Sequence, residues 1–165
     1  MPLSFLLAVL ASPTVADRDP DIAFSKWETF DARLDTVEIW LEPVWKDGER
    51  LPPHYLLRRT ISYRPELNLK GQTIFWANQA SCVQGSDVIT DLAKINMPSI
   101  HVPGVSPEEG ITVRVDGATY RVVVPGQFPS EPGRVVLTFG TETPVANWVN
   151  ASLLALAPCW QTKRP

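Results

Sequence analysis

Prolines are the feature that most limits what this chain can fold into. Sixteen of them are spread through 165 residues, which is about twice the usual share. Each proline lacks a backbone donor and restricts the residue before it, so regular structure tends to end there. Because the prolines follow no repeat, they indicate neither a rigid linker nor a polyproline ligand. We therefore expect short strands joined by irregular loops.

The first sixteen residues have the pattern of a cleaved signal peptide. They carry no charged side chain, contain an apolar run over residues 3–10 and end in small residues suited to cleavage after Ala16. No Lys or Arg precedes the apolar run, so the alternatives are an uncleaved N-terminal strand or a different start. We interpret residues 1–16 as a signal peptide, which predicts a periplasmic or extracellular location. No later apolar run approaches the roughly 18 residues of a membrane helix, so we expect no transmembrane segment after cleavage.

The remaining residues, 17–165, have the length of a single globular domain and can bury a core without a metal. The formal net charge is −3, which argues against nucleic acid as a partner. The expected partner is an unidentified protein or small-molecule ligand. A local basic group lacks an aromatic ladder and is interpreted as a solvated strand face; it consists of Arg58, Arg59, Arg64 and Lys70.

Residues 20–35 have the spacing of an amphipathic helix. Asp19 and Pro20 suit an N-cap and a first helical position. Apolar side chains from Phe24 to Leu34 fall on one arc of a helical wheel. Such a stripe is more typical of core packing than of a ligand site, so we expect an N-terminal helix that packs on a sheet.

A hairpin is expected next in the chain. Residues 36–46 alternate between apolar and polar side chains, which predicts a strand. Asp47 and Gly48 then form the residue pair preferred in a type I′ turn. A two-residue turn would place Lys46 opposite Glu49, which is an attractive pair.

Prolines and tryptophans mark the same hairpin. Pro43 would meet Pro52, and neither can donate to a ladder, so we expect the hairpin to be short and to lie at a sheet edge. Trp40 shares a face with acidic residues, so it is either covered by a loop, which we favour, or exposed as a contact site. Trp40 and Trp45 are therefore secondary binding candidates.

Further elements follow from the same patterns. Matched polarity across an Asp116-Gly117 turn predicts a hairpin over residues 111–124, the clearest local signal. Residues 144–157 fit either a helix beginning after Thr143 or a buried strand, with the helix slightly favoured. The other expectations are strands at residues 55–63, 72–77 and 134–139, a helix from Ser86 to Ile95, and a long loop at residues 96–110.

Together these elements predict a mainly β fold, a single antiparallel sandwich or partly open barrel with an N-terminal helix. A C-terminal helix is added if residues 144–157 are helical. The alternative is an α+β fold with helices on one face of an antiparallel sheet.

The residue types associated with catalysis form no known pattern. His54 and His101 are the two histidines, and His101 lies in the long proline-flanked loop, where an imidazole would be accessible. The chain has no nucleophile elbow, no zinc or calcium spacing and no phosphate-binding glycine loop. We therefore assign no catalytic residue, metal site or cofactor, and keep His101 as a binding candidate.

Cys82 and Cys159 are the two cysteines of the chain. An exported protein meets an oxidising environment, which favours a disulfide over a free thiol. No basic residue lies near Cys82 in the sequence to activate it as a nucleophile. Closing a loop of about 78 residues would stabilise the fold by roughly 4 kcal/mol through lost chain entropy in the unfolded state. We therefore predict a structural bridge.

Three function classes remain open. An exported, non-enzymatic binding or interaction domain is favoured, with the loop at residues 96–110 as its candidate surface. One alternative is a small exported hydrolase that uses carboxylates or His101. The other is a structural component whose edge strand near Pro43 or Pro52 pairs with another chain.

Overall fold

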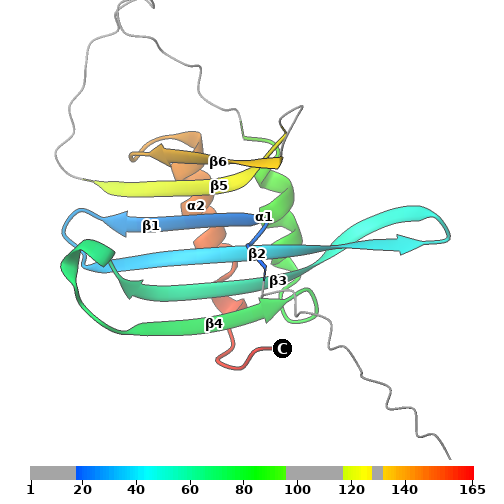
Figure 1. Ribbon diagram of the computed structural model, residues 1–165, viewed down its shortest axis with the longest axis horizontal. Helices are drawn as coiled ribbons and strands as arrows, with labels where there is room; N and C mark the ends of the chain where they lie inside the picture. The colour runs from blue at the N-terminus through cyan, green and yellow to red at the C-terminus, as the bar shows by residue number, and fades with distance from the viewer. Residues whose placement is uncertain (1–17, 96–116, 128–131) are drawn as a thin grey trace, which may run out of the picture.

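The computed structural model describes residues 18–95, 117–127 and 132–165. These residues form an antiparallel sheet in the order β4-β3-β2-β1-β5-β6, and Figure 1 shows helices α1 and α2 crossing the strands on one face. The predicted mainly β fold is confirmed; the sheet is not closed into a barrel, and the helices lie as in the α+β alternative. The elements are β1 (Ile22–Glu28), β2 (Arg33–Lys46), β3 (Glu49–Tyr63), η2 (Pro65–Leu67), β4 (Gln72–Asn78), α1 (Gln84–Leu92), β5 (Ala118–Gln127), β6 (Pro132–Phe139), α2 (Pro144–Ala155) and η3 (Ala157–Cys159).

The predicted N-terminal helix is wrong, because residues 20–35 contain β1, a turn and the start of β2. Ile22 and Phe24 are buried, and Lys26 follows them on the same face of the strand. Phe30, which the helical wheel placed on the apolar stripe, is 86% exposed in the turn. Strand β1 lies inside the sheet, between β2 and β5. Ladders on both sides and burial of alternate side chains outweigh the local helical spacing.

The prolines do not shorten the strands as expected, since β2 has 14 residues and β3 has 15. Pro43, Pro52 and Pro53 lie within these strands, around a register shift in their ladder. This part of the ladder extends past the residues that β1 and β4 contact. A proline on such a free edge removes no hydrogen bond to a third strand, so the strand continues through it. The result is a two-stranded extension at residues 42–53, which we call the arm (Figure 1).

The arm ends in the predicted two-residue turn. Asp47 and Gly48 have φ angles of 52° and 83°, the left-handed backbone that a type I′ turn requires. Lys46 lies opposite Glu49, so the predicted register at the turn is confirmed. The hairpin is longer than expected, and its strands are interior in the body of the sheet.

The hairpin predicted over residues 111–124 does not describe the pairing of β5. Residues 111–115 lie outside the described residues, but both sides of Tyr120 and Val122 are occupied, by β1 and by β6. Tyr120 and Val122 are buried while Arg121 is exposed. The alternation therefore predicted the strand correctly and its neighbours incorrectly.

The core lies between the sheet and the two helices. Phe24 of β1 packs edge-on against Trp148 of α2, with ring centroids 4.9 Å apart. Trp148 Nε1 donates to the Val88 carbonyl of α1 at 3.1 Å. One indole therefore joins a strand and both helices.

Helix α2 confirms the helical alternative for residues 144–157. Thr143 Oγ1 accepts a hydrogen bond from the Ala146 N–H at 3.1 Å, and Pro144 lies in the first turn. This arrangement satisfies an N-terminal donor and places proline where its missing N–H costs nothing.

The predicted disulfide is confirmed. Cys82 and Cys159 are buried and bonded at 2.03 Å, across 77 residues of sequence. The bridge ties the start of α1 to the segment after α2. Tyr55 Oη donates to the Cys82 carbonyl, and Gly85 lets the Tyr55 ring approach α1, because a Cβ on that glycine would lie 2.6 Å from it.

The segment after the bridge covers part of the β4 edge. The Trp76 N–H donates to the Gln161 carbonyl at 2.8 Å, and the Gln161 N–H donates back at 2.9 Å. Helix α1 itself starts at Gln84, two residues before the expected start at Ser86, and ends at Leu92.

Candidate functional site

The arm presents an exposed tryptophan. Trp45 is 64% exposed, and Leu51 near it is also exposed. Arg50 lies directly opposite Trp45 across the ladder. Figure 1 shows the arm projecting past the other strands. Tryptophan and arginine are the side chains that most often dominate binding energy at protein interfaces.

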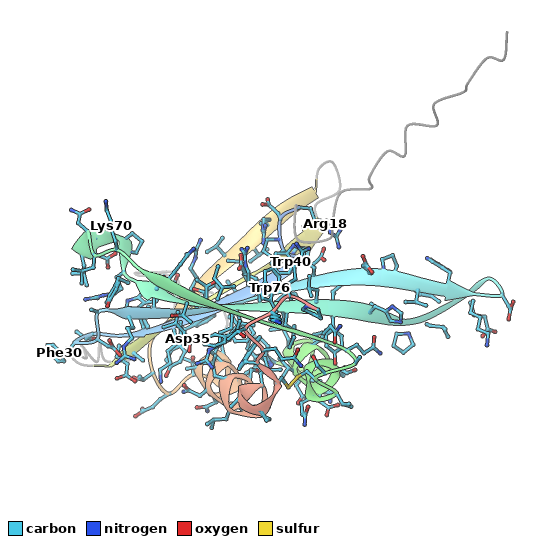
Figure 2. The ribbon with its side chains drawn as sticks, turned by 90° about the horizontal axis from the view of Figure 1, so that it is seen from below. Arg18, Phe30, Asp35, Trp40, Lys70 and Trp76 are labelled. Atoms are coloured by element: carbon cyan, nitrogen blue, oxygen red, sulfur yellow. A yellow bond between two sulfur atoms is a disulfide. The ribbon has the colours of Figure 1, made fainter. Side chains whose placement is uncertain are left out.

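Trp40, one of the predicted binding candidates, is buried and is therefore not an exposed contact residue. Its side chain is only 1% exposed, although Figure 2 shows it on the face away from the helices. Trp40 Nε1 donates to the Arg18 carbonyl at 2.8 Å, and its ring stacks on Trp76 with centroids 6.4 Å apart. The covered alternative is therefore correct, with the segment before β1 as the cover.

Cations surround the tryptophan pair on this face, which we call the open face. The Arg58 guanidinium carbon lies 5.2 Å from the Trp40 ring centroid and 5.8 Å from that of Trp76. Arg164 approaches Trp76 to 5.1 Å. Arg58 also donates twice to the Glu38 carboxylate, at 2.6 and 2.9 Å. These contacts complete a packed polar layer and leave little free aromatic surface for a ligand.

The predicted basic group is not a single strand face. Neighbouring residues of a strand point to opposite faces, so Arg58 lies on the open face and Arg59 on the helix-covered face. Arg59 donates to the Asp35 carboxylate at 2.6 and 3.0 Å. Each guanidinium is partly buried and ion-paired, so the cluster does not act as one positive patch.

A charged cleft lies on the helix-covered face, beside the part that α2 covers. It has a volume of about 600 Å³ and is lined by Lys26, Glu28, Arg33 and Tyr120, among others. A smaller hollow adjoins the cleft and is lined in part by Asp35. Figure 2 shows Asp35 on the helix side of the sheet. The larger volume lies within the range of small-molecule sites.

Every carboxylate at this cleft is close to a cation. Lys26 Nζ lies 3.2 Å from Glu28, and the Arg59 pair with Asp35 closes one side. The third carboxylate, Asp31, lies 3.8 Å from Arg33. The carboxylates of the cleft are therefore neutralised by cations from the same face of the sheet.

The other predicted residues are dispersed. His54 is exposed at the base of the arm, and His101 lies outside the described residues, as does the loop at residues 96–110. Trp45 remains a predicted contact whose exposure is now established. Within the described part of the chain, no three His, Cys, Asp or Glu side chains are grouped as metal ligands.

Sequence reasoning missed the cleft because its residues come from different strands. Lys26 belongs to β1, Arg33 to β2 and Tyr120 to β5. The only signal in the sequence is that charged residues continue the apolar face of β1 and β2 toward the turn between them. That signal was hidden by the helical interpretation of residues 20–35.

Within residues 18–95, 117–127 and 132–165, no helix is both long and apolar enough to cross a membrane. Comparison with known proteins found no matching family model, and no curated protein or solved structure with significant similarity to the chain.

Proposed function

We propose that this protein is an exported binding domain that holds a protein partner with its arm. The observation that carries the proposal is Trp45, a large apolar side chain held on a projecting two-stranded ribbon and 64% exposed. Most of this indole is not buried by the chain itself, whereas burial in a partner would remove roughly 150 Å² from water.

The composition of the arm fits a protein surface as partner. Trp45 is flanked by side chains of both signs, including Lys46, Glu49 and Arg50, which is typical of a polar rim around an aromatic anchor. The three prolines stiffen the ribbon and reduce the entropy lost on binding. Export is supported by the N-terminal sequence pattern and by the disulfide.

The test compares two exposed aromatic residues at opposite ends of the molecule. Trp45→Ala should abolish capture of a partner from the proteins of the compartment to which the chain is exported, while Phe30→Ala, at the end opposite the arm (Figure 2), should retain it. The purified partner should then bind Trp45→Ala at least about 30-fold more weakly, as expected for the loss of a dominant aromatic contact. Equal capture by wild type and Trp45→Ala would refute the proposal.

A second candidate function is the binding of a small polar molecule in the charged cleft, favoured by its volume of about 600 Å³. Ligand-observed NMR with a library of small zwitterions and carboxylates would test it. Binding should be lost in Arg33→Ala and kept in Arg50→Ala, a cation of the arm. No binder that depends on Arg33 would rule this candidate out. The hydrolase alternative gains no support from the ion-paired acids of the cleft.

A further inference from the structure

The edges of the sheet differ in how they are protected. The edge of β4 pairs with Gln161 after the disulfide, and the arm carries Pro43, Pro52 and Pro53 along its free edges. Strand β6 pairs with β5 on one side, and no strand of the described residues pairs with its other side. Unprotected edges are where sheets join other chains, and prolines and charges normally prevent it.

After Pro132 and Arg134, strand β6 contains neither a proline nor a charged side chain. Its one charged side chain, Arg134, is drawn back across β5, where it donates to the Pro20 carbonyl at 2.8 Å and lies 3.5 Å from Asp19. The residues after it are Val-Val-Leu-Thr-Phe, with high strand propensity. Val136 is 50% exposed on the open face. Among the described residues, β6 is therefore an unpaired apolar edge strand whose arginine points back across the sheet.

We infer that β6 pairs with β6 of a second copy of this chain, antiparallel, around a two-fold axis through Val136. This register places Val136 opposite its own symmetry mate. It places Val135 opposite Leu137, and Arg134 opposite Thr138. The axis is perpendicular to the sheet, so the helices of both copies stay on the same side and the two sheets become one.

The chemistry of β6 favours a second copy over an unrelated strand. In this register apolar residues meet apolar residues, and Arg134 meets a neutral Thr138 instead of another arginine, so no like charges oppose each other. Gly133 meets Phe139, the pairing in which an aromatic ring covers an edge glycine. An identical strand supplies these complements automatically, because a two-fold interface uses the same patch on both subunits.

The oligomeric state is the first test. Sedimentation of the purified protein over a range of concentrations should show a reversible dimer. Val136→Lys and Val136→Glu should each raise the dimer dissociation constant at least about tenfold, because like charges then face each other across the axis. An equimolar mixture of the two variants should dimerise again. The control, Leu154→Lys, changes an exposed apolar residue of α2 and should leave the dimer unchanged.

Cysteine pairs then test the register. Opposed residues of an antiparallel pair have Cα atoms about 4.5–5.5 Å apart, which suits a disulfide, so Val136→Cys should cross-link the two copies on oxidation. In Thr138→Cys the two thiols would be four residues out of register, about 13 Å apart, and should not cross-link.

A strictly monomeric wild type overturns the inference, as does a dimer that survives Val136→Lys. Equal cross-linking of both cysteine variants overturns the register. These outcomes are independent of the test of the arm, in which Trp45→Ala is expected to lose its protein partner.

Discussion

The helix-covered face and the open face of the sheet use the same strands but are stabilised in different ways. On the covered face, apolar side chains pack under α1 and α2 and one disulfide joins the helical layer. On the open face, Trp40 and Trp76 are packed by Arg58 and the Glu38 ion pair, and no second layer of secondary structure covers them within the described part of the chain. The difference shows that a sheet can bury a tryptophan with cations and a single extended segment when no helix covers it.

The largest expected change in stability comes from removing the disulfide of the covered face. Replacing both Cys82 and Cys159 with Ala should lower the free energy of unfolding by about 4 kcal/mol, because the unfolded chain regains the entropy of a 77-residue loop. Urea unfolding of the variant, and of wild type with a reductant, measures it. A loss below about 1 kcal/mol would contradict this account of the bridge as a constraint on the unfolded chain.

Neighbouring leucines of β3 compare the faces directly. Leu57 is fully buried under the helices, and Leu56 points to the open face. Leu57→Ala should cost about 3 kcal/mol from lost burial and a cavity, and Leu56→Ala about 1 kcal/mol because its site is partly solvated. Chemical denaturation of both variants gives the two values. Equal losses would contradict the asymmetry between the faces.

The ion pair of the open face should contribute less. Arg58 and Glu38 form a bidentate pair with side chains 31% and 17% exposed. A double-mutant cycle with Glu38→Gln and Arg58→Met should give a coupling of about 1 kcal/mol that decreases in high salt. A coupling near zero would mean that Arg58 acts by stacking on the indoles and not by its charge.

The smallest effect is confined to alkaline pH and reports on the covered face. Burial raises the pKa of Tyr55 above its ordinary value of 10.0, and the negative charge of Asp87 adds to the rise, while a backbone hydrogen bond at Ser86 opposes it. Since the folded pKa is the higher one, Tyr55 contributes stability that is fully present below pH 10 and is lost as pH rises through the folded pKa. Tyr55→Phe should therefore lose less stability above pH 10 than wild type does, as thermal melts across that range would show. Parallel pH profiles would exclude Tyr55 as the group responsible.

Local chemistry predicted the features that depend on neighbouring residues. The Asp47-Gly48 turn followed from a strong backbone preference, and the Thr143-Pro144 start of α2 followed from capping. The disulfide followed from the cysteine count, because two cysteines can form only one intramolecular pair. None of these inferences required knowledge of which strands are neighbours in the sheet.

The failures share one cause, which is that neighbours in the sheet come from distant sequence. Residues 20–35 satisfy a helical period, and only the ladders to β2 and β5 select the strand. Pro43 is tolerated because β1 ends before reaching it. Trp40 is buried by Arg18, 22 residues earlier in the chain. Of the candidate site, Trp45 was therefore recognised by residue type, while its exposure on a long arm and the charged cleft were not predictable.

The position of α2 also determines when the molecule can begin to fold. This helix follows all six strands in the chain, and both it and Cys159 are required to cover the apolar side of the sheet. During synthesis, α1 is the only one of these two helices that can cover that side until residues 144–159 have been made. A chain that stops before Val145 would leave Phe24 without its contact to Trp148 and the apolar side of the sheet only partly covered, so premature termination should give aggregated protein and not a smaller folded domain.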